Sequence, residues 1–187
     1  MYRIITVEDR IRVPPEKLNM KVENAVRESI ADQMEGTIDP RLGVVLSVIS
    51  VENVGEGKIV AGDPGVHYFT RFRLLAFKPE VHELSYGEVI DNTEFGSFVR
   101  IGPMDGLIHI SQLIDDFVSY DNKNSVFLGK ETKRTLKEGD KVRARIIAVS
   151  FGKDENKIGL TMRQSGLGNL LWLAEEKKKK PVKKEKE

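Results

Sequence analysis

The residues best suited to chemistry lie close together in one stretch: Phe95, Phe98 and His109. Phenyl and imidazole rings offer faces on which nucleobases stack, with about 1–3 kcal/mol for each base and little regard for base identity. In a regular strand Phe95 and Phe98 would point to opposite faces, because they are three residues apart. Gly96 permits a β-bulge, which would return both rings to one face. The alternative, which the pattern leaves open, is that one ring fills the core of the domain.

Basic residues are concentrated in two clusters, 130–145 and 177–186, although the formal net charge is only +1. Basic side chains beside stacking rings would follow the phosphates of a nucleic acid. The candidates for this role are Lys141, Arg143, Arg145 and Lys157. The alternatives are an ordinary solvated face for the first cluster and a solubilising tail for the second.

Other combinations of reactive residues are absent from the sequence or too scattered to form a site. The chain has no cysteine, which excludes disulfides and thiolate metal sites and fits a reducing cytoplasm. The three histidines lack metal-ligand spacing and no Ser/His/Asp arrangement is apparent, so we expect no catalytic site, metal or cofactor. Asp115 and Asp116 lie in a polar segment, and we expect them to be solvated.

No apolar run reaches the roughly 18 residues that a membrane span needs. The first 15 residues carry charge where a signal peptide would be apolar. We therefore expect a cytoplasmic protein without membrane contact.

Residues 1–80 predict an α+β domain with a strand, a helix and an antiparallel sheet. Alternation predicts a strand over 2–13, and helical spacing of apolar residues from Leu18 to Ile30 predicts a helix over 16–34. The strands expected next are 44–54, 58–61 and 67–77, with a turn at 53–57. Two loops rich in proline and glycine, TIDPRLG at 37–43 and GDPG at 62–65, are expected at one end of the sheet.

Residues 81–166 predict an all-β domain. The expected strands are 87–91, 95–101, 106–110, 141–150 and 157–162. A helical turn capped by Ser111 and a long polar insertion, 115–136, separate the third strand from the fourth. Five strands with this long link are typical of an OB-fold barrel.

Two further segments carry expectations of their own. The alternation in 141–150 predicts that Val142, Ala144, Ile146 and Ala148 point inward. Residues 167–187 form a short apolar segment with the only tryptophan, Trp172, and then a Lys/Glu-rich tail. The apolar segment either caps the barrel or contacts a partner, and the tail is expected to be disordered.

The motifs FGSFVRI, GLIHIS, GDKVRARI and KIGLTMR resemble the S-one RNA-binding domain, an OB-fold module, across most of residues 87–163. The resemblance implies that Phe95, Phe98, His109 and Lys157 line an RNA face. This family places an acidic residue four positions before the residue that corresponds to Lys157. In this sequence that position is Lys153, with Asp154 beside it.

The whole chain resembles the E-prime family of archaeal RNA polymerase stalk proteins, counterparts of the seventh subunit of eukaryotic RNA polymerase II. The supporting segments are MYRIITVEDRIRVPP, GTIDPRLGVVLSV, GDPGVHYFTRFRLLAFKP and GKETKRTL. The resemblance implies an elongated two-domain stalk subunit, itself without catalysis, within a nucleotidyltransferase complex. It implies a heterodimer with the smaller F subunit of RNA polymerase, docking on the polymerase core near the clamp, and binding of emerging single-stranded RNA.

The candidate docking residues form the two loops Asp39, Pro40, Arg41, Leu42, Gly43 and Gly62, Asp63, Pro64, Gly65. The second loop lacks the Gly-Lys-Ser/Thr ending of a phosphate-binding loop, so a turn or a protein contact fits it better.

Three other functions remain open. An RNA-degradation complex of the exosome type would use the same barrel with a different first half. A translation initiation factor subunit normally carries a similar barrel at its N-terminus, whereas the barrel here is C-terminal. An enzyme in its own right would need a catalytic set that the sequence does not show.

Overall fold

In the computed structural model the chain forms two units, residues 1–78 and 79–187. The structure describes residues 1–152 and 156–179. The sequence predicted the division two residues later, and it separated the last 21 residues, whose described part belongs to the second unit.

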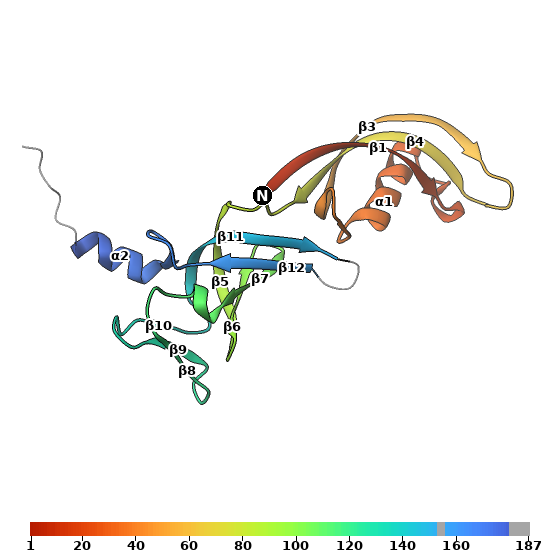
Figure 1. Cartoon of the computed structure of the whole chain (residues 1–187). Helices are drawn as coiled ribbons and strands as arrows, with labels where there is room; N and C mark the ends of the chain where they lie inside the picture. The colour runs from red at the N-terminus through yellow and green to blue at the C-terminus, as the bar shows by residue number, and fades with distance from the viewer. Residues whose placement is uncertain (153–155, 180–187) are drawn as a thin grey trace, which may run out of the picture. The chain divides into compact units, whose positions relative to one another are not determined.

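The first unit is an antiparallel sheet that curves around one face of a helix (Figure 1). Its strands are β1 (Tyr2–Val13), β2 (Ile38–Asp39), β3 (Gly43–Ile59) and β4 (Val66–Phe77), in the order β1-β4-β3-β2. The 3-10 turn η1 (Pro15–Lys17) and the helix α1 (Val22–Met34) lie between β1 and β2. The α+β fold predicted for this half is confirmed.

The helix buries an apolar stripe but is shorter than predicted. Ala25, Val26 and Ile30 pack with Phe72 of β4 in the core, as the helical spacing indicated. The first helical turn is the separate 3-10 turn η1. The extended backbone of Lys21, with ψ 136°, separates η1 from α1. Residues 16–21 are therefore outside the helix, and Leu18 and Val22, expected on the buried face, are both exposed.

Strand β3 runs without a turn through the segment where the sequence predicted one. Register shifts against β4 between Val51 and Asn53 and between Val54 and Gly57 absorb the glycine-rich segment as bulges. The predictions of a turn at 53–57 and of a separate strand over 58–61 are therefore wrong.

The uninterrupted strand has a consequence for the two candidate docking loops. Val44 pairs with Phe77 at one end of the sheet, and Ile59 pairs with Val66 at the other. The loop 39–43 thus adjoins the first end and the loop 62–65 adjoins the second. The expectation that both loops lie at one end was wrong, because it assumed a chain reversal at 53–57 that does not occur.

The second unit is a barrel made by β5 (Leu84–Thr93), β6 (Gly96–Ile101), β7 (Met104–His109), β11 (Lys141–Phe151) and β12 (Asn156–Thr161). Strand β12 pairs antiparallel with β11 and parallel with β7, which closes the sheet on itself. The closed barrel confirms the predicted OB-type architecture. Its interior is filled by alternating residues such as Val99, Ile108 and Ile146, all fully buried.

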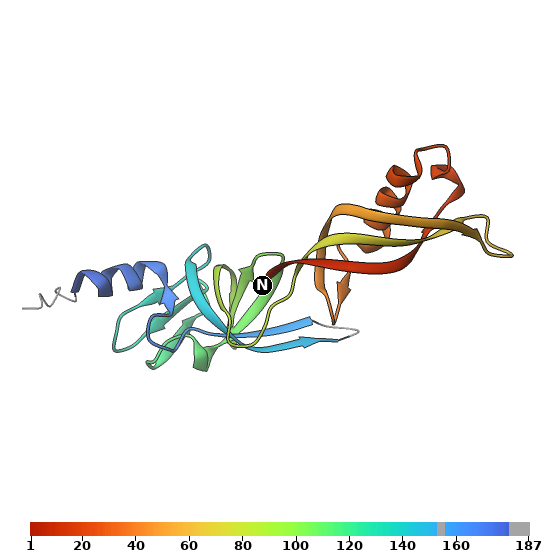
Figure 2. The ribbon, with the colours of Figure 1, turned by 90° about the horizontal axis from the view of Figure 1, so that it is seen from above.

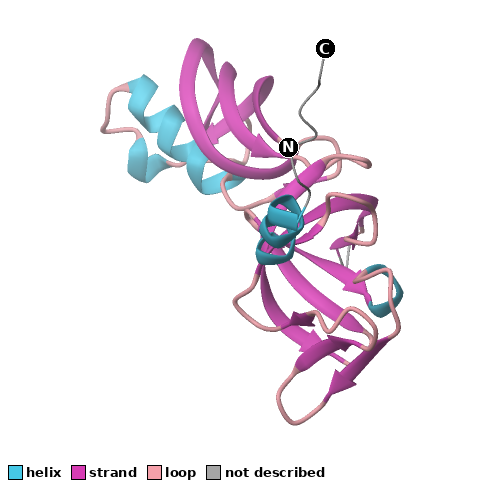
Figure 3. Cartoon of the chain, turned by 90° about the vertical axis from the view of Figure 1, so that its left-hand side faces the viewer, coloured by secondary structure: helices cyan, strands magenta, loops and turns pink. Residues whose placement is uncertain are grey.

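The insertion is folded rather than merely polar. It forms a sheet of β8 (Val118–Asp121), β9 (Val126–Gly129) and β10 (Thr135–Leu136), seen near the foot of Figure 3. Phe127 and Leu136 are fully buried beneath it. The two aspartates expected to be solvated have partners: Asp116 accepts the N–H of Thr132 at 2.9 Å, and Asp115, which is exposed as expected, pairs with Arg163 at 2.7 Å.

The last elements pack on the second unit. Strand β13 (Gly168–Asn169) pairs with β11, and α2 (Leu170–Lys179) follows it. Trp172 and Leu173 are buried, and the Arg134 guanidinium lies 5.5 Å from the centre of the Trp172 ring. This apolar segment therefore packs within the chain through Trp172 and Leu173, whereas Leu171 is 68% exposed. The disorder predicted for the tail is wrong as far as Lys179, and residues 180–187 lie outside the described residues.

The close pairing at the start of β3 predicts a large effect of one substitution. Gly43 has φ +84°, and a Cβ built on it would lie 2.3 Å from the Phe77 carbonyl oxygen. Gly62 has a similar φ of +87° with nothing within 4 Å. We expect Gly62→Ala to lower the free energy of unfolding by about 1–2 kcal/mol, the cost of the left-handed conformation alone. Gly43→Ala should cost clearly more, because backbone atoms must also move apart.

Urea unfolding followed by far-ultraviolet circular dichroism measures both variants. Trp172 lies in the second unit, so its fluorescence transition serves as an internal control. Equal losses for the two alanine variants would contradict the close approach at Gly43.

Candidate functional site

The Phe95 and Phe98 rings lie together on the barrel surface, edge to face, with centroids 5.9 Å apart and planes at 89°. Phe95 is 52% exposed and Phe98 is partly exposed, so neither fills the core. The bulge expected at Gly96 is absent, because Gly96 and Phe98 pair regularly with His109 and Leu107. The rings share a face because Phe95 lies in the turn between β5 and β6, outside the alternation of the strand.

A row of outward-facing residues crosses the barrel beside these rings. Phe98 pairs with Leu107, Leu107 with Gly159, and Gly159 with Ala148, so the row spans β6, β7, β12 and β11. Its last two members are small, which leaves a depression between the larger side chains. The resulting hollow, here called the barrel hollow, has a volume of about 800 Å³ and is lined by residues of these strands and Gln112.

His109 and Lys157 add polar groups to the lining of the barrel hollow. His109 Nδ1 lies 2.8 Å from Ser111 Oγ and accepts the Ser111 N–H at 3.3 Å. His109 is therefore the cap of the short helix η2 (Ile110–Gln112), and the prediction of Ser111 as the cap was wrong. Capping fixes the imidazole orientation while the residue stays exposed. Lys157 is exposed on β12, in register with Ser150.

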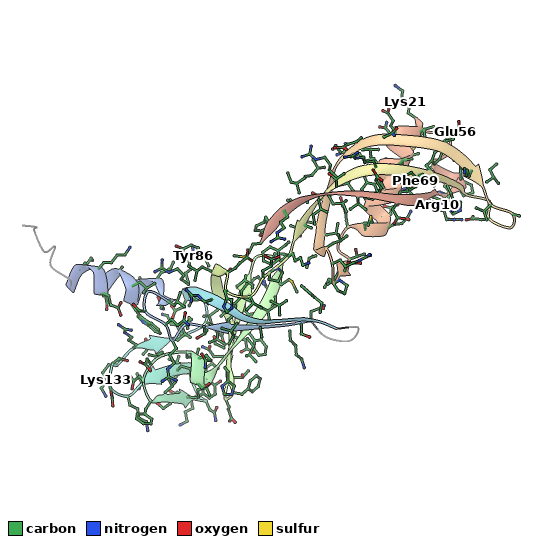
Figure 4. All side chains as sticks on the ribbon, turned by 45° about the horizontal axis from the view of Figure 1, so that its top comes forward. Arg10, Lys21, Glu56, Phe69, Tyr86 and Lys133 are labelled. Atoms are coloured by element: carbon green, nitrogen blue, oxygen red, sulfur yellow. The ribbon has the colours of Figure 1, made fainter. Side chains whose placement is uncertain are left out.

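The structure does not bring the other predicted basic residues into the barrel hollow. Lys141, Arg143 and Arg145 point outward on the half of β11 that pairs with β5, where their partners are Glu88, Tyr86 and Leu84. Tyr86, marked in Figure 4, is 63% exposed on that part of the barrel.

The Nε atoms of Arg143 and Arg145 are buried, and no acceptor for them is found in the described part of the chain. Lys153 and Asp154, which fall where the S-one family places an acidic residue, lie outside the described residues.

Several residues of the barrel hollow were missed from the sequence. The inward alternation of β11 holds for Val142, Ala144 and Ile146 and then fails, because the register against β12 shifts between Ile146 and Ala148. Ile147 and Ala148 are consequently both exposed and line the hollow. In β11 itself no sequence signal marks this shift, but the partner residue of Ala148 on β12 is Gly159. A glycine such as Gly159 inside a strand is the kind of signal that indicates a bulge or a close approach.

The end of the β3–β4 hairpin, residues 59–66, is a second candidate site and extends past α1 (Figure 2). Arg12 holds Asp63 with a pair of hydrogen bonds, Nε to Oδ2 at 2.8 Å and Nη2 to Oδ1 at 2.7 Å. The Gly65 N–H donates to Oδ1 at 2.9 Å, and His67 Nε2 lies 2.8 Å from Oδ2. These contacts fix the loop on the edge strand β1.

Apolar side chains surround this fixed loop. Ile59 is 80% exposed, Val60 50% and Phe69 56%. They line a pocket of about 330 Å³ together with charged residues such as Arg10 and Glu56. Figure 4 shows Arg10 and Phe69 on neighbouring strands there. Exposed apolar groups on and beside a rigid loop are typical of a protein contact surface.

Neither a cluster of metal ligands nor a membrane-spanning helix is found in the part of the chain that the structure describes. Among residues 1–152 and 156–179, no group of His, Asp or Glu side chains is arranged to hold a metal ion. Within the same residues no helix has the length and apolar character to cross a membrane.

Known protein families match both halves of the chain. The SHS2 domain found in the N terminus of Rpb7p/Rpc25p/MJ0397 matches residues 8–64, and the S1 RNA binding domain matches residues 78–163. The DNA-directed RNA polymerase subunit Rpo7 of Saccharolobus shibatae is 37% identical over 180 residues, which cover 95% of this chain and 100% of that protein. The chain belongs to the Rpo7 family of RNA polymerase subunits. The resemblance to the E-prime family is thereby confirmed.

More distant relatives extend the comparison. The DNA-directed RNA polymerase II subunit rpb7 of Dictyostelium discoideum is 23% identical, covering 78% of this chain and 86% of that protein. The solved structure of RNase R from Mycoplasma genitalium is 28% identical over 43% of this chain and 13% of that chain, with a TM-score of 0.38. The match to polymerase subunits includes the first half, where a degradation module would differ.

The hydrogen bonds around Asp63 predict an unusual titration. The Arg12 guanidinium, then the Gly65 N–H and His67, hold the pKa of the Asp63 carboxyl well below its ordinary value. The lowered pKa means that the ionised carboxylate stabilises the loop above about pH 4, and that this contribution is lost as the pH falls. We expect Arg12→Gln to raise the pKa of Asp63 toward the ordinary value, measured by carbon-13 NMR of the carboxyl group. If the pKa of Asp63 is unchanged in Arg12→Gln, Arg12 is not the main cause of the lowered pKa.

Proposed function

We propose that this member of the Rpo7 family is a non-catalytic stalk subunit that binds single-stranded RNA in the barrel hollow. The observation that carries the proposal is the edge-to-face pair of Phe95 and Phe98 at the rim of an apolar depression on an S1 barrel. Exposed rings stack with bases of any identity, and the small residues Ala148 and Gly159 leave room for a base between larger side chains.

Charge and polarity at the barrel hollow suit a nucleic acid strand. Lys157 supplies a cation for a phosphate, and His109 presents a third flat ring beside the two phenyl rings. We propose that Lys141, Arg143 and Arg145 contact phosphates of a longer strand as it leaves the hollow. Each phosphate neutralised on single-stranded RNA should add about −0.7 to the slope of log K against log salt.

Removal of the rings tests RNA binding directly. Phe95→Ala combined with Phe98→Ala should weaken binding of a labelled oligouridylate at least about tenfold, because one or two stacking contacts of about 1–3 kcal/mol are lost. Fluorescence anisotropy measures the affinity. The matched control is Phe69→Ala, which removes an equally exposed phenyl group from the first unit and should leave RNA affinity unchanged. Wild-type affinity in the folded double variant would refute the proposal.

We propose that the hairpin end docks on the polymerase core. The support is physical: Ile59, Val60 and Phe69 are exposed on and beside a loop that the Arg12–Asp63 ion pair keeps in shape. Rigid apolar groups lose little conformational entropy on binding. The opposite loop, 39–43, carries the highly exposed Arg41 and is the weaker candidate of the two.

Variants at the two ends of the sheet separate these docking surfaces. Ile59→Asp with Phe69→Ala should weaken association with the purified polymerase core at least about tenfold, measured by interferometry, while RNA affinity stays unchanged. Arg41→Ala should leave core association within about twofold. The reverse pattern, loss with Arg41→Ala only, would place the docking surface at the other end of the sheet.

The remaining parts of the proposal concern partners and catalysis. We propose that the chain forms a heterodimer with the smaller F subunit and supplies no catalytic group, so that the chemistry belongs to the polymerase core. The family membership supports a place in that complex. Co-purification with the F subunit tests the heterodimer, and nucleotide turnover by the purified chain would contradict the absence of catalysis.

A further inference from the structure

We propose that the insertion sheet, β8–β10, positions the Phe95 ring for RNA, with Tyr120 and Asn122 as positioning residues. This assigns a role in RNA binding to residues that do not line the barrel hollow. The inference rests on the proposed RNA-binding function and adds a requirement to it.

Phe95 lies outside the strand ladder; its carbonyl accepts the Ile110 N–H at 2.9 Å, and the preceding residues 92–94 need support of their own. Phe95 lies in the turn at residues 94–95, and pairing with β7 begins only at Gly96. Within the turn, Thr93 Oγ1 donates to the Gly96 carbonyl at 3.0 Å. An exposed ring on a turn samples several positions unless neighbouring groups fix its backbone, and ordering it on binding costs affinity.

The insertion sheet supplies hydrogen bonds to residues 92–94, on the N-terminal side of Phe95. The Tyr120 hydroxyl donates to the Asn92 carbonyl at 2.7 Å. The Asn92 side-chain amide donates in return to the Ser125 carbonyl at 2.9 Å. Asn122 Nδ2 donates to Glu94 Oε1 at 3.2 Å, directly beside Phe95. The hairpin formed by β8 and β9 therefore holds residues 92–94 from one side through these hydrogen bonds.

The hairpin residues that make these hydrogen bonds are held in place because they pack into a small core. The Tyr120 ring lies 5.0 Å from that of Phe127, which is fully buried, and Asn92 is only 3% exposed. Leu136 of β10 is also fully buried, and its carbonyl lies 3.4 Å from the Asn92 amide. Closely packed side chains of this kind hold a few positions only. The turn with Phe95 is thus fixed to a folded element and not to a loose loop.

A double-mutant cycle tests whether Tyr120 acts through Phe95. Tyr120→Phe removes one hydroxyl and should weaken oligouridylate binding about threefold to tenfold, the scale of one lost hydrogen bond. In the Phe95→Ala background the same change should alter affinity less than about twofold, because no ring remains to be positioned. Asn122→Ala, at an exposed residue, should behave in the same way with a smaller loss.

Controls separate this inference from general effects on the fold. Tyr86→Phe makes the same chemical change on an exposed tyrosine of the barrel and should leave affinity unchanged. The Trp172 fluorescence transition in urea reports whether the second unit stays folded. If Tyr120→Phe is unstable, the double-mutant cycle with Phe95→Ala is measured with Asn122→Ala instead.

The outcomes are distinct. Failure of the wild-type protein to bind oligouridylate would refute the proposed function itself. Wild-type binding with unchanged affinity in Tyr120→Phe and Asn122→Ala would refute only the positioning role. Losses that add fully to that of Phe95→Ala would show that these residues act by another route, and this too would overturn the inference.

Discussion

The barrel hollow depends on one constraint, the closure of the barrel by β12. Because β12 pairs with β7 on one side and β11 on the other, Leu107, Gly159 and Ala148 fall into one outward row. Gly159 leaves the middle of the row open, and a Cβ at this position would lie 3.3 Å from that of Ala148. Without closure these residues would not be neighbours, since β7 and β12 lie far apart in sequence, at 104–109 and 156–161. The depression beside Phe98 is therefore a property of the closed barrel.

The two candidate sites use different physical means to present exposed apolar groups. On the barrel, the Phe95 ring lies on a turn that hydrogen bonds from the insertion sheet support. At the hairpin end, a charged pair between Arg12 and Asp63 gives the loop its shape, and Ile59 projects beside it. Hydrogen bonds and ion pairs here do not form the proposed binding surfaces; they hold the rings and aliphatic groups of which we propose those surfaces consist.

Much of the fold could be predicted from the sequence, because alternation and helical spacing reflect burial. The strand 2–13, the core face of α1 around Val26 and the inward residues of β11 up to Ile146 all follow from such patterns. What could not be predicted depends on pairing between distant segments. The register shift at Ala148 and the bulges that let β3 run past Gly57 are set by the partner strand, which the local sequence does not reveal.

The candidate site was predictable in part for the same reason. Phe95, Phe98, His109 and Lys157 carry a motif, and the structure brings them to one side of the barrel. Arg143 and Arg145 are near in sequence to the hollow's residues 147–150, yet they face a different part of the barrel, because β11 changes partners along its length. No local sequence signal marks Tyr120, since the role proposed for it depends on contact with Asn92 across 28 positions.

The most direct test of the account is an NMR titration of the intact chain with oligouridylate, observing aromatic and methyl groups. The account predicts that the largest shifts occur at Phe95, Phe98, Leu107 and Ile147, and that Tyr86 and Phe69 change little. Large shifts confined to Tyr86 and Leu84, with the barrel hollow unchanged, would contradict it, because RNA would then bind the half of β11 that pairs with β5 and not the surface that barrel closure creates.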